Sequence, residues 1–349
     1  MSQPANLGAP PEISSTTPRL EDLAGAPGTT RRDLQAAKKS RSLWGNAWRQ
    51  FRRHRLAMAG LFLLIFMIWA TFAGNSLYTQ EIDTIDFSLE SQFPSVAHPF
   101  GTDSLGQDIL ARILWGGRIS IAVGILAALV SITLGTTLGA IAGFRGGFVD
   151  SLLMRITDMF ISLPQLPLLL LISFLYRDQI YQTFDERFDG ERLNKVTGVL
   201  DIEGGNLGIF LLIVFVIAIL NWMPTARLVR AEFLSLKEKE FVESAKSVGA
   251  RQHTLMFRHI LPNVMSPIIV AATLAVGAAI ITESSLSFLG LGFPSDVPTW
   301  GRMLFDYAPY LQVAPYQSLF PGLVIFLTVL SINYVGDGLR DALDPRKAR

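Results

Sequence analysis

The sequence predicts an all-α polytopic membrane protein with six transmembrane helices. Of its 349 residues, 50% are hydrophobic and only 17% are charged. The mean hydropathy of +0.38 is well above that of a soluble domain of this size. Six uncharged runs are long enough, at about 1.5 Å per residue, to cross or nearly cross a hydrocarbon core of about 30 Å. Because alternation with a period of two residues is absent, a transmembrane barrel is not expected.

The six predicted spans share the absence of Asp, Glu, Lys and Arg, and they cover residues 56–73, 119–143, 159–176, 207–223, 264–282 and 319–335. The first span follows 55 residues, too many for the charged start of a cleavable signal peptide, so we expect a permanent anchor. Pro164 and Pro167 lie in the third span, where each removes a backbone donor and should bend the helix. Neighbouring helices or cavity water must then satisfy the freed carbonyls, which makes both prolines candidates for a translocation pathway.

The N-terminal region divides into a tail and a short helix. Residues 1–41 are expected to form a disordered cytoplasmic tail, because the first thirty are rich in Pro, Ser, Thr and Gly and have little apolar content. Within residues 42–55, Trp44, Trp48 and Phe51 recur at helical spacing beside four arginines. This pattern favours an amphipathic helix in the headgroup layer, and ordinary flanking charges with interface aromatics are the alternative interpretation.

The distribution of lysine and arginine predicts the orientation. If the N-terminus is cytoplasmic, 23 of the 30 Lys and Arg residues fall in inside segments and 7 fall in outside segments. Both termini and the segment 224–263 should therefore face the cytoplasm. Residues 74–118 and 177–206 should form long extracytoplasmic segments, and residues 119–349 should form the main transmembrane domain.

The composition also excludes several classes of function. The chain has no Cys, which excludes disulfides, thiolate metal sites and a cysteine nucleophile. None of the four His lies in a predicted span, so no metal site is expected. The absence of a P-loop and of HExxH, GxSxG and GxGxxG elements predicts a chain that binds no cofactor and is not an enzyme. A net charge of +1 gives no indication of a nucleic-acid partner.

Few ionisable residues approach the predicted spans. Glu283 follows the fifth span, and Arg155 and Asp158 precede the third at i, i+3 spacing. One interpretation is that all three lie at the interface and pair with local groups. The other is that Glu283 faces a water-filled translocation pathway, as intramembrane acids often do. The second interpretation predicts that Glu283→Gln changes transport more than assembly.

A charged stretch, EFVESAKSVGARQHTLMFRHILPN, separates the fourth and fifth predicted spans. Phe241, Ala245 and Val248 fall at i, i+4 and i+7 on one helical face, and charged residues occupy another. Gly249 follows at the position of a left-handed C-terminal cap. A second short helix can then continue until Pro262, which removes a donor and starts the next span. This compact polar hairpin between two spans predicts docking to a protein partner.

In this stretch the sequence resembles the transmembrane subunits of bacterial ABC importers. Their cytoplasmic loop carries a Glu-Ala-Ala element, a glycine four residues after its last alanine, and a Leu-Pro before the next span. The matching residues are Glu243, Ser244, Ala245, Gly249, Leu261 and Pro262. The spacing fits throughout, and Ser244 replaces the middle alanine.

Further stretches narrow the resemblance to the C-type permease subunit of oligopeptide, dipeptide and nickel importers. They are the start SLWGNAWRQFRRHRLAMAG, then HPFGTDSLGQDILARILWGGRIS, ESSLSFLGLGFP, PTWGRML and GDGLRDALDPR. The resemblance extends from about residue 42 to the end of the chain. One departure is the segment 177–206, which is longer than the connection usual in the family.

The resemblance implies the type I permease fold of ABC importers, in the bacterial inner membrane. This subunit would form the translocation pathway for peptides together with a homologous B-type subunit, and an extracytoplasmic substrate-binding protein would deliver the solute. Two ABC ATPase subunits would bind ATP and Mg²⁺ and drive the spans through a coupling helix. The implied docking element contains Glu243, Ser244, Ala245 and Gly249, with Lys246, Ala250 and Arg251 at the contact.

Three alternatives to peptide import stay open at this point. Nickel chelates or another small solute are one, since the absence of histidine from the spans disfavours only the ligation of a naked metal. A secondary transporter driven by an ion gradient is the second, and it would work without ATPase partners. The third is a membrane scaffold, whose loss would leave solute uptake unchanged.

Overall fold

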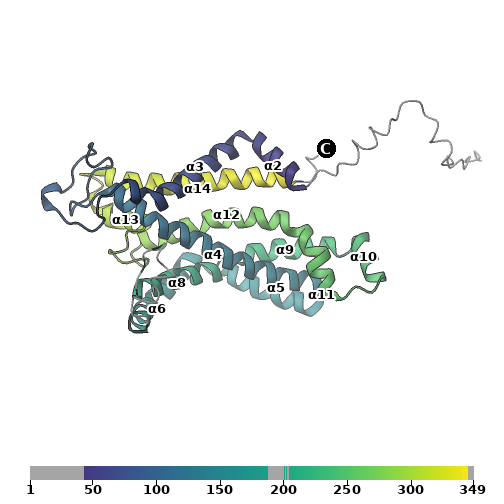
Figure 1. Cartoon of the computed structure of the whole chain (residues 1–349). Helices are drawn as coiled ribbons and strands as arrows, with labels where there is room; N and C mark the ends of the chain where they lie inside the picture. Colours follow the sequence, from purple (N-terminus) through teal and green to yellow (C-terminus); the bar gives the residue numbers. More distant parts are fainter. Residues whose placement is uncertain (1–42, 188–199, 201, 203, 345–349) are drawn as a thin grey trace, which may run out of the picture. The chain divides into compact units, whose positions relative to one another are not determined.

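The computed structural model describes residues 43–187, 200, 202 and 204–344. The expected tail over residues 1–41 and the middle of the 177–206 segment lie outside the described residues. The chain divides into two compact units, Met1–Asn46 and Ala47–Arg349, and the second unit carries the membrane helices (Figure 1). Among the described residues every regular element is a helix, and extended backbone pairs only in an isolated bridge between Thr102 and Asp108.

The helices of the first half are α2 (Leu43–Arg53), α3 (Arg55–Leu77), the short 3-10 helix η1 (Phe87–Leu89), α4 (Ile109–Arg145), α5 (Gly147–Ser162) and α6 (Gln165–Arg187). Those of the second half are α8 (Gly204–Ile219), α9 (Met223–Leu236), α10 (Glu240–Ser247), α11 (Gln252–Thr254), the π-helix η2 (Leu255–Ile260), α12 (Leu261–Phe288), α13 (Trp300–Tyr307), η3 (Ala308–Tyr310) and α14 (Pro315–Leu343).

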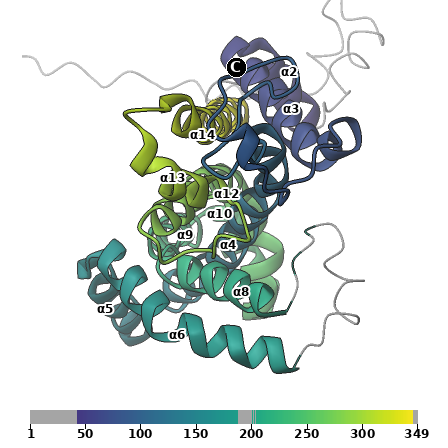
Figure 2. The same cartoon turned by 90° about the vertical axis from the view of Figure 1, so that its left-hand side faces the viewer.

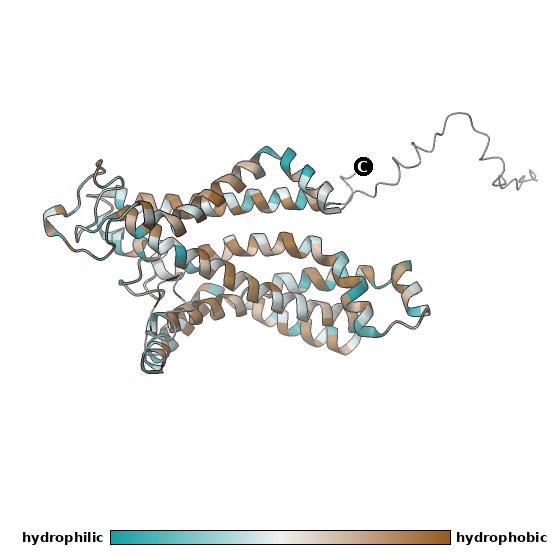
Figure 3. Ribbon diagram, in the orientation of Figure 1, coloured by the Kyte–Doolittle hydropathy of each residue, from teal (hydrophilic) through white to brown (hydrophobic). Residues whose placement is uncertain are grey.

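Four helical stretches are long and apolar enough to cross a membrane, and they lie in α3, in α4, in α11 to α12, and in α14. Two bent pairs, α5 with α6 and α8 with α9, bring the number to six if each pair forms one span. Figure 3 shows hydrophobic residues along these helices. The prediction of an all-α polytopic membrane protein is therefore confirmed for the described part of the chain.

The third predicted span, residues 159–176, is not one straight helix. It straddles the break between α5 and α6, where the axis bends by 84°. Pro164 lies in this break, because it cannot donate a backbone hydrogen bond to continue α5. Pro167 is the third residue of α6, where a backbone N–H has no intrahelical partner in any case. Of the two prolines expected to bend the helix, only Pro164 lies at the bend.

Helix α4 begins ten residues before the predicted start of the second span. Asp108 caps it by accepting a hydrogen bond from the Ala111 N–H at 2.8 Å. Arg112, one turn later, is buried and donates to the Gln107 side chain. The charge-free run missed these ten residues because Arg112 and Arg118 interrupt it, although both guanidinium groups donate to partners within the fold.

Helix α4 lies among α3, α8, α9 and α12, so it forms the centre of the second unit (Figure 2). Trp300 of α13 is wholly buried against it and donates its indole N–H to the Ile113 carbonyl at 3.0 Å. Near the same end, the Tyr307 hydroxyl contacts Asp103 at 3.5 Å. Burial raises the pKa of Tyr307, so its hydroxyl stays neutral and donates to the carboxylate.

Candidate functional site

The hairpin over residues 240–263 begins with α10 and turns at Gly249. Gly249 has a φ of +86°, the left-handed conformation that the sequence predicts at this position. Its N–H donates to the Lys246 carbonyl at 2.9 Å, and the Ala250 N–H donates to the Ala245 carbonyl at 3.1 Å. These two bonds form a Schellman motif, which fixes the direction in which the chain leaves α10.

One face of α10 packs against the membrane helices. Val242 is fully buried in a cluster with Phe233 of α9, Ile260 of η2 and Val264 of α12. Ala245 packs partly buried against the same cluster. Of the predicted apolar stripe of Phe241, Ala245 and Val248, only Ala245 packs against this cluster. Phe241 and Val248 are exposed, Val248 at 89%, so the predicted contact of this stripe with a protein partner stays a prediction.

The other face of α10 is exposed in the part of the chain that the structure describes. Of the residues proposed for docking, those exposed are Glu243, Ser244, Lys246, Gly249, Arg251 and Pro262, whereas Ala245, Ala250 and Leu261 pack partly buried against the hydrophobic cluster. Figure 1 shows α10 projecting beyond α9 and α11, at the end of the helical unit opposite α13. The hairpin therefore combines an inner apolar attachment with an outer surface that carries both charged residues and the apolar side chains of Phe241 and Val248.

The second helix of the hairpin does not stop at Pro262. Instead α11, η2 and α12 run on without a break. The Leu261 N–H donates to the Met256 carbonyl five residues earlier, so the backbone forms a π turn just before the proline. This wider turn accommodates a ring that the interior of a regular α-helix would exclude. The second half of the hairpin is thus the beginning of the candidate membrane span Gln252–Phe288.

Helix α9, which supports the hairpin, packs closely against three glycines of α4. A Cβ atom added at Gly139 would lie 2.4 Å from the Ala226 carbonyl oxygen, and one at Gly135 would lie 2.6 Å from the Trp222 carbonyl oxygen. At Gly143 it would lie 2.7 Å from Cβ of Phe233. Such small residues at intervals of four allow two helix backbones to approach. Sequence reasoning missed this contact, although the repeat GTTLGAIAG was visible in the second span.

Ion pairs join α9 to α5 beside the glycine contact. Arg230 donates to both carboxylate oxygens of Asp150, and the fork geometry of such a pair fixes the two helices in register. Asp158 pairs with Arg227 of α9. The suggested local pair of Arg155 with Asp158 is therefore wrong, since Asp158 is held by a residue from another helix. The second pair is largely exposed, so its contribution to stability is small.

Glu283 lies within α12 and is 0% exposed. Its carboxyl accepts a hydrogen bond from the Ser287 hydroxyl at 2.8 Å and is also bonded by the side chains of Ser120, Ser284 and Thr299. These hydroxyls come from α4, α12 and the cap of α13. The carboxyl therefore joins three helices inside the chain, while Pro164 and Pro167 are both exposed. That any of the three lines a translocation pathway stays a prediction.

Replacing Glu283 with leucine should lower the melting temperature of the assembled protein. Each buried hydroxyl that loses its carboxyl acceptor costs about 1–3 kcal/mol. Glu283→Gln keeps one acceptor oxygen and should recover much of the loss. Thermal melting and solute uptake are measured on both variants. A glutamine variant that melts like the natural protein but fails to transport would contradict a purely structural role.

The helical spans and the hairpin packed against them define a polytopic membrane subunit. Residues 135–349 match the family described as "Binding-protein-dependent transport system inner membrane component". Residues 42–94 match the N-terminal transmembrane domain of oligopeptide transport permease C. The chain belongs to this family of inner-membrane transport components. It is a multi-pass, non-catalytic permease subunit of an ABC importer with the type I permease fold, as the sequence resemblance implied.

Relatives from several bacteria are similar over nearly the whole chain. The glutathione transport system permease protein GsiD of Pectobacterium atrosepticum is 40% identical over 310 residues, which cover 88% of this chain and 93% of that protein. The oligopeptide transport system permease protein OppC of Bacillus subtilis is 37% identical, covering 89% and 92%. The dipeptide transport system permease protein DppC of Alkalihalophilus pseudofirmus is 39% identical, covering 87% and 90%.

Proposed function

We propose that this chain imports peptides, forming with a homologous B-type subunit the membrane pathway of an ATP-driven transporter. The hairpin carries this proposal, because one of its faces is braced by α9 and α12 while the other is exposed for a partner. The relatives support the choice of solute. They are named for glutathione, oligopeptides and dipeptides, which share the peptide bond as their common chemistry.

The proposed orientation places both termini and the hairpin in the cytoplasm. It rests on the excess of Lys and Arg in the inside segments, 23 of 30. Two ATPase subunits then bind the hairpin from the cytoplasm and hold the ATP and Mg²⁺, so this chain itself binds no cofactor. A substrate-binding protein delivers the peptide on the opposite side, where residues 74–118 and 177–206 lie.

Movement of the ATPases reaches the spans through packed side chains. A force on the outer face of α10 passes through Val242 to Phe233 of α9. It continues to α4 through the close contact of Gly139 with Ala226. Rigid elements in contact transmit a rigid-body rotation, which a flexible linker would absorb.

The proposal is tested by reconstituting the two permease subunits in proteoliposomes with and without the ATPases and the binding protein. Peptide uptake should require ATP and all partners, and an imposed ion gradient should not replace them. Uptake driven by an ion gradient in the absence of ATPases would identify a secondary transporter and overturn the proposal.

Substitutions at Gly249 separate the shape of the hairpin from its contact with the ATPases. Gly249→Val should weaken ATPase binding, because positive φ strains a β-branched residue by about 1 kcal/mol or more. Asparagine tolerates this conformation, and a Cβ atom at Gly249 meets no atom of the described residues within 4 Å. Gly249→Asn should therefore keep the hairpin folded. Co-purification of the ATPases is measured for both, and wild-type yield with the valine variant would contradict the prediction.

A further inference from the structure

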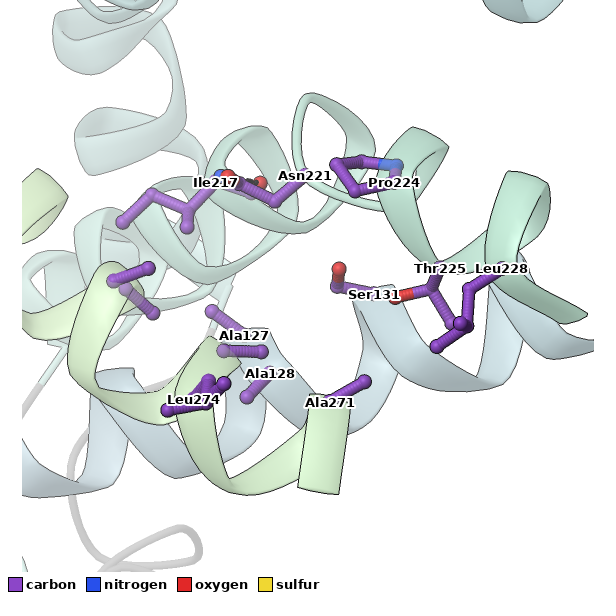
Figure 4. A pocket seen from close by; sticks show the side chains of 13 residues that line it. Ala127, Ala128, Ser131, Ile217, Asn221, Pro224, Thr225, Leu228, Ala271 and Leu274 are labelled. Atoms are coloured by element: carbon purple, nitrogen blue, oxygen red, sulfur yellow. Dashed lines mark hydrogen bonds between the residues drawn. The ribbon is translucent and has the colours of Figure 1, made fainter. Parts of the chain in front are cut away.

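A cavity of about 290 Å³ lies among α4, the junction of α8 with α9, and α12. Figure 4 shows the side chains that line it. Most of its wall is made of small residues, including Ala127 and Ala128 of α4 and Ala271, Ala275 and Ala278 of α12. Leu274 also lines it and is exposed, so the cavity reaches the surface of this chain. It is distinct from the cluster around Glu283.

Among the described residues that line the cavity, three are polar and neutral, Ser131, Asn221 and Thr225, and none is charged. The amide nitrogen of Asn221 donates to the Ile217 carbonyl at 2.8 Å. The amide oxygen of Asn221 is therefore the atom of this side chain that can accept a hydrogen bond from a ligand. These lining residues offer no opposite charge to an ion. They offer hydrogen-bond partners to an uncharged ligand that carries donors and acceptors.

The hydroxyl of Ser131 is buried and has no hydrogen-bond partner among the described residues. Ser131 is 1% exposed. Two other hydroxyls of the same helix, on Thr133 and Thr137, each bond the carbonyl four residues earlier at 2.7 Å. In Figure 4 the Ser131 hydroxyl instead points away from its own helix, toward the segment between Asn221 and Pro224. Because buried polar groups are nearly always paired, this hydroxyl is available to bond a polar group that enters the cavity.

The wall opposite Ser131 is a broken helix. Helices α8 and α9 meet at an angle of 43°, and Pro224 at the start of α9 cannot donate to the carbonyl four residues earlier. Broken helices at membrane depth are tolerated where they line a cavity or are buried in protein. The break between α8 and α9 therefore lines the same cavity as Ser131 and Asn221.

We propose that this cavity is a subsite for the transported peptide and binds an uncharged peptide group. The Ser131 hydroxyl donates to a peptide carbonyl, and the Asn221 amide oxygen accepts from a peptide N–H. This inference rests on the proposed import of peptides. The cavity lies at the lower end of the range of ligand cavities, about 300–1,000 Å³, so it holds only part of a peptide. Its uncharged lining and alanine wall suit peptides of varied sequence.

Substitutions at Ser131 test the subsite in the reconstituted transporter. Ser131→Ala removes one hydrogen bond to the peptide and should raise the KM of uptake by about threefold to tenfold. The same change removes an unpaired buried hydroxyl, so the melting temperature should stay the same or rise. Ser131→Leu fills the cavity and should abolish uptake while the ATPases still bind and hydrolyse ATP. Thr133→Ala, whose hydroxyl is already bonded within its own helix, is the matched control and should leave KM unchanged.

Occupancy is measured directly with single cysteines, because the natural chain contains none. Reaction of Ser131→Cys with a small thiol reagent should slow when the binding protein, a transported dipeptide and ATP are supplied together. Leu129→Cys, two residues away at a position that is 60% exposed, should react at an unchanged rate.

Equal rates with and without the dipeptide, or an unaltered KM in both Ser131→Ala and Ser131→Leu, would overturn the subsite. These outcomes differ from a failure of the proposed function, in which the unsubstituted transporter shows no ATP-dependent peptide uptake.

Discussion

Replacing Gly139 with leucine is expected to prevent assembly of the transporter. A single Cβ atom at this position already lies 2.4 Å from the Ala226 carbonyl oxygen and 3.0 Å from Cβ of Val229. Because the nearest atom belongs to the backbone of α9, it cannot move aside as the end of a flexible side chain could. Overpacking by even a small group costs about 1–3 kcal/mol, and leucine adds three further carbons. Helices α4 and α9 must then separate, which removes the support of the hairpin.

The measurement is the yield and melting temperature of the purified complex. Thr137→Leu is the matched control, because Thr137 lies two residues away on α4 and is exposed. It adds apolar bulk to the same helix without entering the contact with α9. A Gly139→Leu complex that purifies in normal yield and melts at the normal temperature would show that the close approach of α4 and α9 is not required.

Replacing Val242 with aspartate should uncouple ATP hydrolysis from transport. The new carboxylate would lie in an apolar cluster with Phe233, Leu255 and Ile260, and a buried charge without a partner costs several kcal/mol. Undocking α10 exposes the carboxylate to water and avoids this cost. The membrane helices keep their own contacts, so we expect a folded complex in which the hairpin no longer transmits force.

The detached hairpin is detected by limited trypsin digestion at Lys246 and Arg251, which become more susceptible when α10 opens locally. Peptide uptake and ATP hydrolysis are measured on the same preparation. Val242→Ile is the control, since it keeps the cluster apolar. Wild-type cleavage rates together with full uptake in the aspartate variant would contradict the role given to the inner face of α10.

The sequence alone predicts the features that depend on local chemistry. Uncharged runs indicate the membrane helices, and Gly249 marks the end of α10 because glycine adopts positive φ without strain. The loop motif that contains Glu243 also identifies residues of the hairpin that are exposed in the structure, among them Ser244 and Gly249. The roles of these residues in docking stay predictions, because a single chain contains no partner.

Features that depend on tertiary contacts could not be predicted from the sequence. Arg118 ended the charge-free run of the second span, but α4 begins ten residues before that run, and its buried Arg112 donates to the side chain of Gln107. Val242 and Phe241 are adjacent and both apolar, so only the packing of α9 decides which of them is buried. The unpaired hydroxyl of Ser131 has no sequence signal, since Thr133 and Thr137 look alike in the sequence but bond their own helix.

The central claim, that ATPases drive this subunit through the hairpin, is tested most directly by cross-linking from single cysteines in the otherwise cysteine-free chain. Ser244→Cys places the probe on the exposed face of α10, and Val313→Cys places it before α14 at a position that is 77% exposed. In the assembled transporter, Ser244→Cys should cross-link to an ATPase subunit, while Val313→Cys should react with a membrane-impermeant reagent added to the extracytoplasmic side. Cross-linking of Val313→Cys to an ATPase, or none from Ser244→Cys in an actively transporting complex, would contradict the account.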